Sequence, residues 1–164
     1  MNTSRSNTTT RTSTTAKPAK DALALLESDH EDVRPLFAEY EKTRSVANKK
    51  SLVAEICAAL SVHAQIEEEI FYPAVKSALK DKFLVPEATV EHASVKDLID
   101  QLESSEPGGE MYDAKVTVLS EYVKHHVKEE QDEMFTKVQS SSLDLVELGA
   151  RMTARKEELL AVAA

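Results

Sequence analysis

The sequence is poor in several residue types, and each shortage excludes a class of structure. It has a single cysteine, Cys57, so an intrachain disulfide framework is excluded and nothing favours an oxidising compartment. Tryptophan is absent, glycine occurs three times, and aromatic residues make up 5% of the chain, which favours helices over β-sheets. No apolar run approaches the roughly 18 residues of a membrane span, and the N-terminus lacks the apolar stretch of a secretory signal. We therefore expect a cytoplasmic, helical protein with no membrane partner.

Basic residues are outnumbered by acidic ones. The chain contains 20 Lys and Arg against 29 Asp and Glu, which gives a formal net charge of −9 at pH 7. Such a chain has no footprint for nucleic acid or anionic lipid, so we expect small-molecule partners and a monomer or weak homodimer. Residues 1–20 are basic and rich in Ser and Thr, as transit peptides are, but they include almost no apolar residue. We expect them to form a disordered tail.

Apolar residues recur at the three-to-four spacing of amphipathic helices through the rest of the chain. Pro35 is expected to kink the first helix and Pro73 to end or bend the second, because proline removes a backbone donor. Glu106-Pro107-Gly108-Gly109 separates the third helix from the fourth. The pattern predicts helices over residues 22–44, 48–71, 86–104, 110–135 and 143–162.

Four helices of this length match the dimensions of an antiparallel bundle. We therefore predict an all-α fold, an up-down-up-down four-helix bundle over residues 21–139. The additional C-terminal helix, within residues 140–164, is expected to pack on the outside of the bundle. The fourth helix is expected to bury Met111, Val116 and Leu119.

One chemical pattern occurs twice along these helices. A histidine in one helix is followed in the next by His-x-x-x-Glu: His30 precedes His63 and Glu67, and His92 precedes His126 and Glu130. The flanks agree, since DHEDVRPLF around His30 aligns with EHASVKDLI around His92. Residues four apart share a helix face, so each His-x-x-x-Glu pair presents an imidazole and a carboxylate to one point.

The four repeated histidines share their helix faces with apolar residues, whereas His125 is surrounded by charged ones and is expected to face solvent. A single histidine on an apolar face is usually a core residue whose hydrogen bonds are satisfied. Burying four histidines and two glutamates without partners would cost about 1–3 kcal/mol for each group. A metal satisfies all of them together, and imidazole with carboxylate suits iron, manganese or zinc rather than calcium.

These residues resemble a known family. Residues from about Ala22 to Leu160 are similar to hemerythrin-like, or HHE cation-binding, proteins. The resemblance implies a non-haem di-iron centre inside a four-helix bundle, bridged by two carboxylates and a solvent oxygen, with O₂ or a related molecule at an open position. Carried over to this chain, it implies four terminal histidine ligands and two bridging glutamates: His30, His63, His92 and His126, and Glu67 and Glu130. The matching stretches are SDH at 28–30, HAQIEEEIFYPAV at 63–75, VEH at 90–92, HHVKEEQDEMF at 125–135 and LDLVELGARMTARKEEL at 143–159.

Two departures separate the chain from oxygen-carrying hemerythrins. Those proteins have a fifth histidine four residues from another on the third helix, but Ala88 and Lys96 occupy both such positions around His92. Their last motif is His-x-x-x-x-Asp, whereas this chain has Gln131 there and its carboxylate one residue earlier, at Glu130. The resemblance therefore implies binding or sensing of O₂, nitric oxide or peroxide, iron handling, or oxidant defence rather than O₂ transport.

Two other functions stay open. The first is a di-iron enzyme with catalase-like or nitric-oxide-reducing activity, in which Tyr122 or a glutamate beside the ligands would move protons. Tyr122, one turn before His126, is the candidate catalytic residue that would steer a bound oxygen species, and the alternative is that it is an amphipathic core residue. The second is a structural bundle without metal. Supporting residues are also expected: Lys96 should point outward, Cys57 should be an inert core residue, and an acceptor for an imidazole N–H should come from Glu68, Glu69, Glu91 or Glu129.

Overall fold

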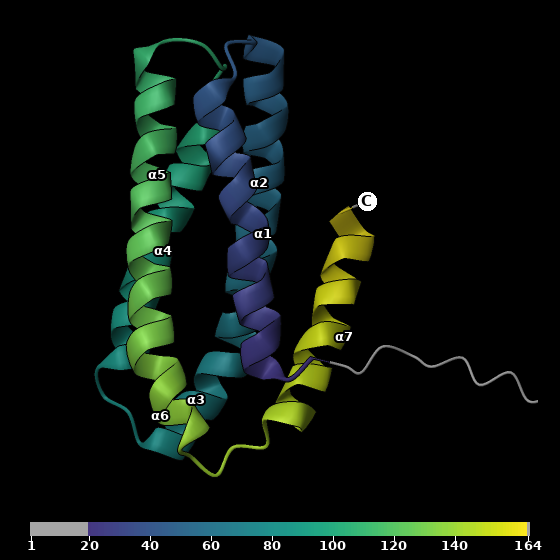
Figure 1. The fold of residues 1–164 in the computed structure, drawn as a ribbon, viewed down its shortest axis with the longest axis vertical. Coiled ribbons are helices and arrows are strands. Elements are labelled where there is room, and N and C mark those ends of the chain that lie inside the picture. Colours follow the sequence, from purple (N-terminus) through teal and green to yellow (C-terminus); the bar gives the residue numbers. More distant parts are fainter. Residues whose placement is uncertain (1–19, 164) are drawn as a thin grey trace, which may run out of the picture.

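In a computed structural model, which describes residues 20–163, all regular secondary structure is helical. Four long helices form an antiparallel bundle, with α1 beside α2 and α4 beside α5 (Figure 1). The disordered tail expected over residues 1–20 lies outside the described residues, apart from Lys20. The helices are α1 (Ala22–Lys42), α2 (Val46–Ile66), η1 (Glu67–Phe71), α3 (Tyr72–Leu79), α4 (Leu84–Glu103), α5 (Glu110–Glu129), η2 (Glu130–Met134), α6 (Phe135–Gln139) and α7 (Leu145–Ala163).

Side-chain caps fix where the helices begin. The Asp21 carboxylate accepts the Ala24 N–H at 2.8 Å at the start of α1, and the Ser45 hydroxyl accepts the Asn48 N–H at 3.2 Å at the start of α2. Gly109 precedes α5 with φ 104°, a conformation that favours glycine. These caps satisfy backbone donors that a helix leaves unpaired at its first turn.

The second and fourth bundle helices do not end where the sequence predicted. Each widens into one π-helical segment, η1 or η2, and then returns to α-helix. The Tyr72 N–H bonds the Glu67 carbonyl, and the Phe135 N–H bonds the Glu130 carbonyl. Pro73 is the second residue of α3, so the helix continues past Phe71. At this change of register the missing N–H of the proline costs little. Both π segments begin at a glutamate of the repeated pattern.

The apolar core is divided into two clusters. One surrounds Phe71, Phe135 and Met152 near α3, α6 and the first half of α7, and the other surrounds Ile56 and Leu119 in the opposite half of the bundle. Each bundle helix passes from one cluster to the other at a histidine of the repeated pattern. The polar layer is therefore enclosed by apolar packing on both sides.

The fourth helix starts with a different residue facing inward from the one predicted. Met111 was expected to be buried, but it is 70% exposed, while Tyr112 is 5% exposed and joins the core. The predictions for Val116 and Leu119 are correct. A shift of one residue at the first turn turns the helix by about 100°, which exchanges these two neighbours.

The fifth helix packs on the outside of α1 and α2, as predicted (Figure 1). It packs tightly against the start of α1 at Gly149, where an added Cβ would lie 2.6 Å from the Ala22 nitrogen and from the Asp21 carbonyl carbon. Arg155 and Lys156 of α7 form ion pairs with Glu69 and Asp29. Among the described residues, no helix is both long and apolar enough to cross a membrane.

Replacing Gly149 with alanine is predicted to destabilise the protein. The new methyl group would overlap backbone atoms at the start of α1, which cannot rotate away as a side chain can, and overpacking of this kind typically costs about 1–3 kcal/mol. Chemical denaturation would measure the change, with the exposed neighbouring substitution Ala150→Ser as the control. An unchanged free energy of unfolding in Gly149→Ala would contradict the close packing of α7.

Candidate metal centre

The six side chains of the repeated pattern meet in the polar layer of the bundle. They come from α1, α2, η1, α4, α5 and η2, and each residue is at most 8% exposed. Their donor atoms form two groups that share Glu67. The sequence pattern therefore brings together the residues it singled out: His30, His63, Glu67, His92, His126 and Glu130.

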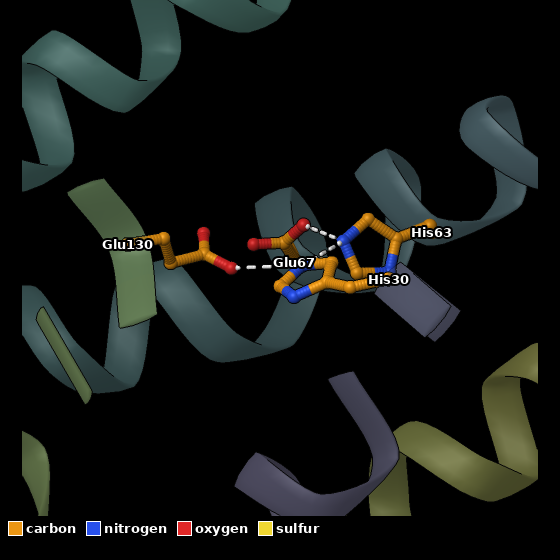
Figure 2. A group of neighbouring side chains, drawn as sticks. All are labelled: His30, His63, Glu67 and Glu130. Carbon is orange, nitrogen blue, oxygen red and sulfur yellow. Dashed lines mark hydrogen bonds and ion pairs between the residues drawn. The ribbon is translucent and has the colours of Figure 1, made fainter. Parts of the chain in front are cut away.

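The first group contains His30, His63, Glu67 and Glu130 (Figure 2). The Nε2 atoms of His30 and His63 lie 3.2 Å apart. Glu67 Oε1 is 2.5 Å from His63 Nε2, and Glu130 Oε1 is 3.4 Å from His30 Nε2. Two imidazole nitrogens and two carboxylate oxygens thus surround one small volume.

The second group repeats this arrangement with His92 and His126. Their Nε2 atoms also lie 3.2 Å apart. Glu67 Oε1 is 3.9 Å from His92 Nε2, and Glu130 Oε2 is 3.3 Å from His126 Nε2. Glu67 Oε1 therefore faces one histidine of each group, and Glu130 turns Oε1 toward the first group and Oε2 toward the second.

The outward nitrogen of every histidine has its own partner. The partner is always adjacent in sequence to a member of the cluster: Asp29 precedes His30, Glu91 precedes His92, Glu68 follows Glu67 and Gln131 follows Glu130. Such partners fix the orientation of a metal-binding imidazole. The Nδ1 contacts are His30 with Gln131 at 2.8 Å, His63 with Asp29 at 3.0 Å, His92 with Glu68 at 3.2 Å and His126 with Glu91 at 3.4 Å.

The inward atoms fit a bound cation. A neutral histidine that donates from Nδ1 to a carboxylate has only a lone pair at Nε2, and these lone pairs face further carboxylate oxygens. Glu67 Oε2 and Glu130 Oε1 are buried without a hydrogen-bond partner. Buried oxygens left in this state are costly, and a metal shared between nitrogen and oxygen donors would satisfy them.

Without metal, protons take over part of this role. Burial alone would lower the pKa of His63, but the carboxylates of Glu67, Asp29 and Glu130 outweigh it and raise this pKa to about 10. Burial likewise opposes protonation of His126, yet Glu130 and Glu91 raise its pKa to about 11. Both rings are thus protonated at neutral pH, so a metal binding at these nitrogens would displace protons.

A tyrosine reaches the cluster, but it is not the predicted one. Tyr122 was proposed as a catalytic residue near His126, but it is 45% exposed and the structure corrects this interpretation. Tyr72 is 2% exposed, donates its hydroxyl to Glu130 Oε2 at 2.5 Å, and lies 3.1 Å from His92 Nε2 and 3.3 Å from His126 Nε2. Tyr72 follows Glu67 by five residues, and only the change of register at η1 turns it toward the cluster, so α-helical spacing carried no signal for it.

The two groups differ at this tyrosine. Phe135 follows η2 as Tyr72 follows η1, and its ring stacks on His30 at a centroid distance of 6.2 Å. The second group is therefore in contact with the Tyr72 hydroxyl, whereas the first group is in contact with the hydrocarbon ring of Phe135. Burial, followed by the charges of Glu67 and Glu130, raises the pKa of Tyr72 well above its usual value, so the metal-free hydroxyl keeps its proton.

The predicted supporting residues are partly correct. Glu68 and Glu91 contact imidazoles, whereas Glu69 pairs with Arg155 of α7 and Glu129 pairs with the exposed His125. Lys96 points outward and binds Glu68 at 2.6 Å, and Cys57 is buried, both as predicted. Asp29 and Gln131 were not predicted.

Asp29 also connects the centre to the fifth helix. Its second oxygen forms a short ion pair with Lys156 of α7. Burial would raise the pKa of Asp29, but hydrogen bonds from His63 and Lys156 hold it below its usual value. An acceptor that is charged at neutral pH therefore faces His63, and its ion pair with Lys156 of α7 helps to hold it there.

A cavity of about 640 Å³ leads to all four histidines of the cluster. Apolar side chains including Val33, Val95 and Val123 line it, and Lys96, Asp100 and Lys156 are among its charged lining residues. A cavity of this size admits small molecules as far as these histidines.

Substituting Asp29 by asparagine is predicted to weaken metal binding by about 10–100-fold. The amide keeps the size of the side chain and can still accept a hydrogen bond from His63 Nδ1. It lacks the negative charge that makes His63 Nε2 a stronger electron-pair donor to a metal. Competition with a chelator would measure the affinity, with the exposed Glu31→Gln as the control for loss of a nearby charge. Equal affinities for Asp29→Asn and the unmodified protein would contradict this role.

Two curated proteins are similar in sequence to much of this chain. The uncharacterized protein Rv2633c from Mycobacterium tuberculosis is 30% identical over 117 residues, covering 66% of this chain and 67% of that protein. A DNA nickase from Nostoc sp. is 26% identical over 117 residues, and the chain spans about a third of its length (33%). DNA nicking is an activity of that longer protein.

A solved structure has the same fold. The hemerythrin HHE cation binding domain-containing protein from Mycobacterium kansasii, described as an Rv2633c homolog, superposes with a TM-score of 0.72 at 25% identity. The match covers 88% of this chain and 90% of that one. The sequence profile of the hemerythrin HHE cation binding domain matches residues 21–138, which contain all six clustered residues. The chain therefore belongs to the hemerythrin HHE cation-binding family.

Proposed function

We propose that the protein holds two iron ions and binds O₂ or a related small molecule such as nitric oxide or peroxide. One observation carries the proposal: six buried residues form two groups of donor atoms that share Glu67, and two of their carboxylate oxygens, Glu67 Oε2 and Glu130 Oε1, lack a hydrogen-bond partner. Two ions in these groups would supply open coordination positions and electrons for oxygen chemistry. Mixed imidazole and carboxylate donors favour iron, with manganese and zinc as less favoured alternatives.

In this proposal the four histidines are terminal ligands and the two glutamates are bridges. The bridging role is supported by the contacts of each carboxylate with one histidine from each group. Within the protein, Asp29, Glu68, Glu91 and Gln131 hold the imidazoles so that every Nε2 faces inward. The apolar clusters on either side keep bulk water away from these donors.

Sensing, iron handling or oxidant defence fits this centre better than O₂ transport. Ala88 is buried in an apolar cluster, and Lys96 is bound to Glu68 with half of its side chain exposed, so neither position adds a donor. Four histidines leave more coordination positions open to exchange than five do. We also propose diffusible small molecules rather than nucleic acid as partners, given the net charge of −9.

Protein purified from iron-replete cells is predicted to contain about two iron ions per chain. Its optical spectrum should change on exposure to air, peroxide or nitric oxide, because each would reach the open positions through the cavity. Metal analysis with absorption spectroscopy measures both quantities, and removal of the metal should lower the melting temperature. Colourless, iron-free protein whose melting temperature does not respond to a chelator would sink the proposal.

A second candidate function is an enzyme that consumes peroxide or nitric oxide. The observation that favours it is the Tyr72 hydroxyl, which lies within hydrogen-bond reach of Glu130, His92 and His126. A neutral phenol at this place can hold or donate a proton during turnover of a bound molecule. It also offers an oxygen donor to iron, which makes the second group chemically different from the first.

Tyr72→Phe is predicted to lower peroxide turnover by the iron-loaded protein by about 100-fold or more, because the proton donor is removed. The fold should persist, since Phe135 already fills the corresponding position of the other half. Peroxide consumption and the optical spectrum would be measured together, with the exposed Tyr122→Phe as the matched control. If the iron-loaded, unmodified protein consumes peroxide no faster than free iron in solution does, the proposal of an enzyme is wrong.

A further inference from the structure

A third group of donor atoms lies outside the buried cluster. Glu91 of α4 and His125 and Glu129 of α5 bring one imidazole and two carboxylates together, with ligand atoms within 4.8 Å of one another. His125 Nε2 is 3.3 Å from Glu129 Oε1 and 3.8 Å from Glu91 Oε2. The His125 side chain is 64% exposed and that of Glu91 is 20% exposed, so the group extends from the surface inward.

Within residues 20–163, the other half of the internal repeat has no equivalent of this group. In the other half of the bundle, Val62 and Ile66 stand where α5 carries His125 and Glu129. Asp29, which corresponds to Glu91, is held there by Lys156. One half therefore has a lysine that neutralises the carboxylate, and the other half has two additional donors beside it.

Glu91 connects the outer group to the buried centre. Its Oε1 contacts His126 Nδ1 at 3.4 Å. Its Oε2 is buried without a hydrogen-bond partner and faces His125. An unpartnered carboxylate oxygen next to an exposed imidazole offers two donors of the kinds that a divalent cation binds.

A small cavity lies along the same path. Its volume is about 20 Å³, enough for about one water molecule. Apolar side chains of Leu84, Ala88 and Met134 line it together with His126 and four acidic residues: Glu87, Glu91, Glu129 and Glu130. Negative charge therefore continues from the outer group to the second group of the buried centre.

We propose that Glu91, His125 and Glu129 form an entry site for a divalent metal ion on its way to the buried centre. This inference rests on the proposed function, because it needs a centre to be loaded. One imidazole and two carboxylates suit Fe²⁺, Mn²⁺ or Zn²⁺, and with three exchangeable protein donors the site holds the ion weakly. Glu91 then lies between the two sites, contacting donors of both.

The test is metal binding and loading by the metal-free full-length chain. Mn²⁺ titration followed by electron paramagnetic resonance should give three equivalents in the unmodified protein, the third weaker than the others. His125→Ala and Glu129→Gln should lose only the third equivalent, and Fe²⁺ loading followed by stopped-flow absorption should slow by about tenfold. Glu133→Gln removes an exposed carboxylate one turn further along and should change neither.

The outcomes separate this inference from the proposed function. Equal stoichiometry and equal loading rates in His125→Ala and the unmodified protein would overturn the entry site, even if two ions bind in the centre. If the unmodified protein binds a single ion and His125→Ala binds none, the buried centre fails while the outer site stands. Anomalous scattering from a Mn²⁺-soaked crystal would locate the ion between Glu91, His125 and Glu129, or would contradict the assignment.

Discussion

The arrangement of the centre depends on how many electron-pair donors, imidazole nitrogens and carboxylate oxygens, are packed into one layer of the bundle. Four imidazole nitrogens and two carboxylates face each other between two apolar clusters, where their attraction for a cation is weakly screened. The surrounding contacts follow from this requirement, because every Nδ1 is turned outward by an acceptor and every Nε2 is left facing the others. Protons on His63 and His126 can relieve the repulsion in part, whereas two metal ions would relieve it throughout the layer.

The internal repeat explains the shape of the centre, and its departures explain the chemistry that we propose. Both halves supply a histidine, a His-x-x-x-Glu pair and a π segment that starts at the glutamate. They differ where Tyr72 corresponds to Phe135 and where Glu68 corresponds to Gln131. A charged acceptor and a hydroxyl thus act on the second group, and a neutral amide and a hydrocarbon ring act on the first. Two ions in such a site would be inequivalent.

The sequence predicted the fold and the cluster because both depend on periodicity. Histidines on apolar stripes and carboxylates four residues on are visible from spacing alone. The π segments were not predicted, since α spacing and π spacing differ by one residue and the apolar pattern tolerates both. Tyr72 lies beyond η1, so α-helical spacing did not place it on the face of the cluster. Tyr122 was therefore considered as the tyrosine near the metal ligands. Asp29 and Lys156 meet across 127 positions of the chain, a contact that only the docking of α7 creates.

The π segments also limit how this chain can change in length. Each holds one residue more than an α-helix needs for the same turn and rise, and the residues that follow, such as Tyr72 and Val75, belong to the core around α7. Deleting one residue within a π segment would restore regular α-helix and leave these side chains facing the core, whereas a deletion in the α-helical part before it would rotate everything beyond by about 100°. One residue can therefore be lost from these two helices without turning the adjacent core only within the π segments.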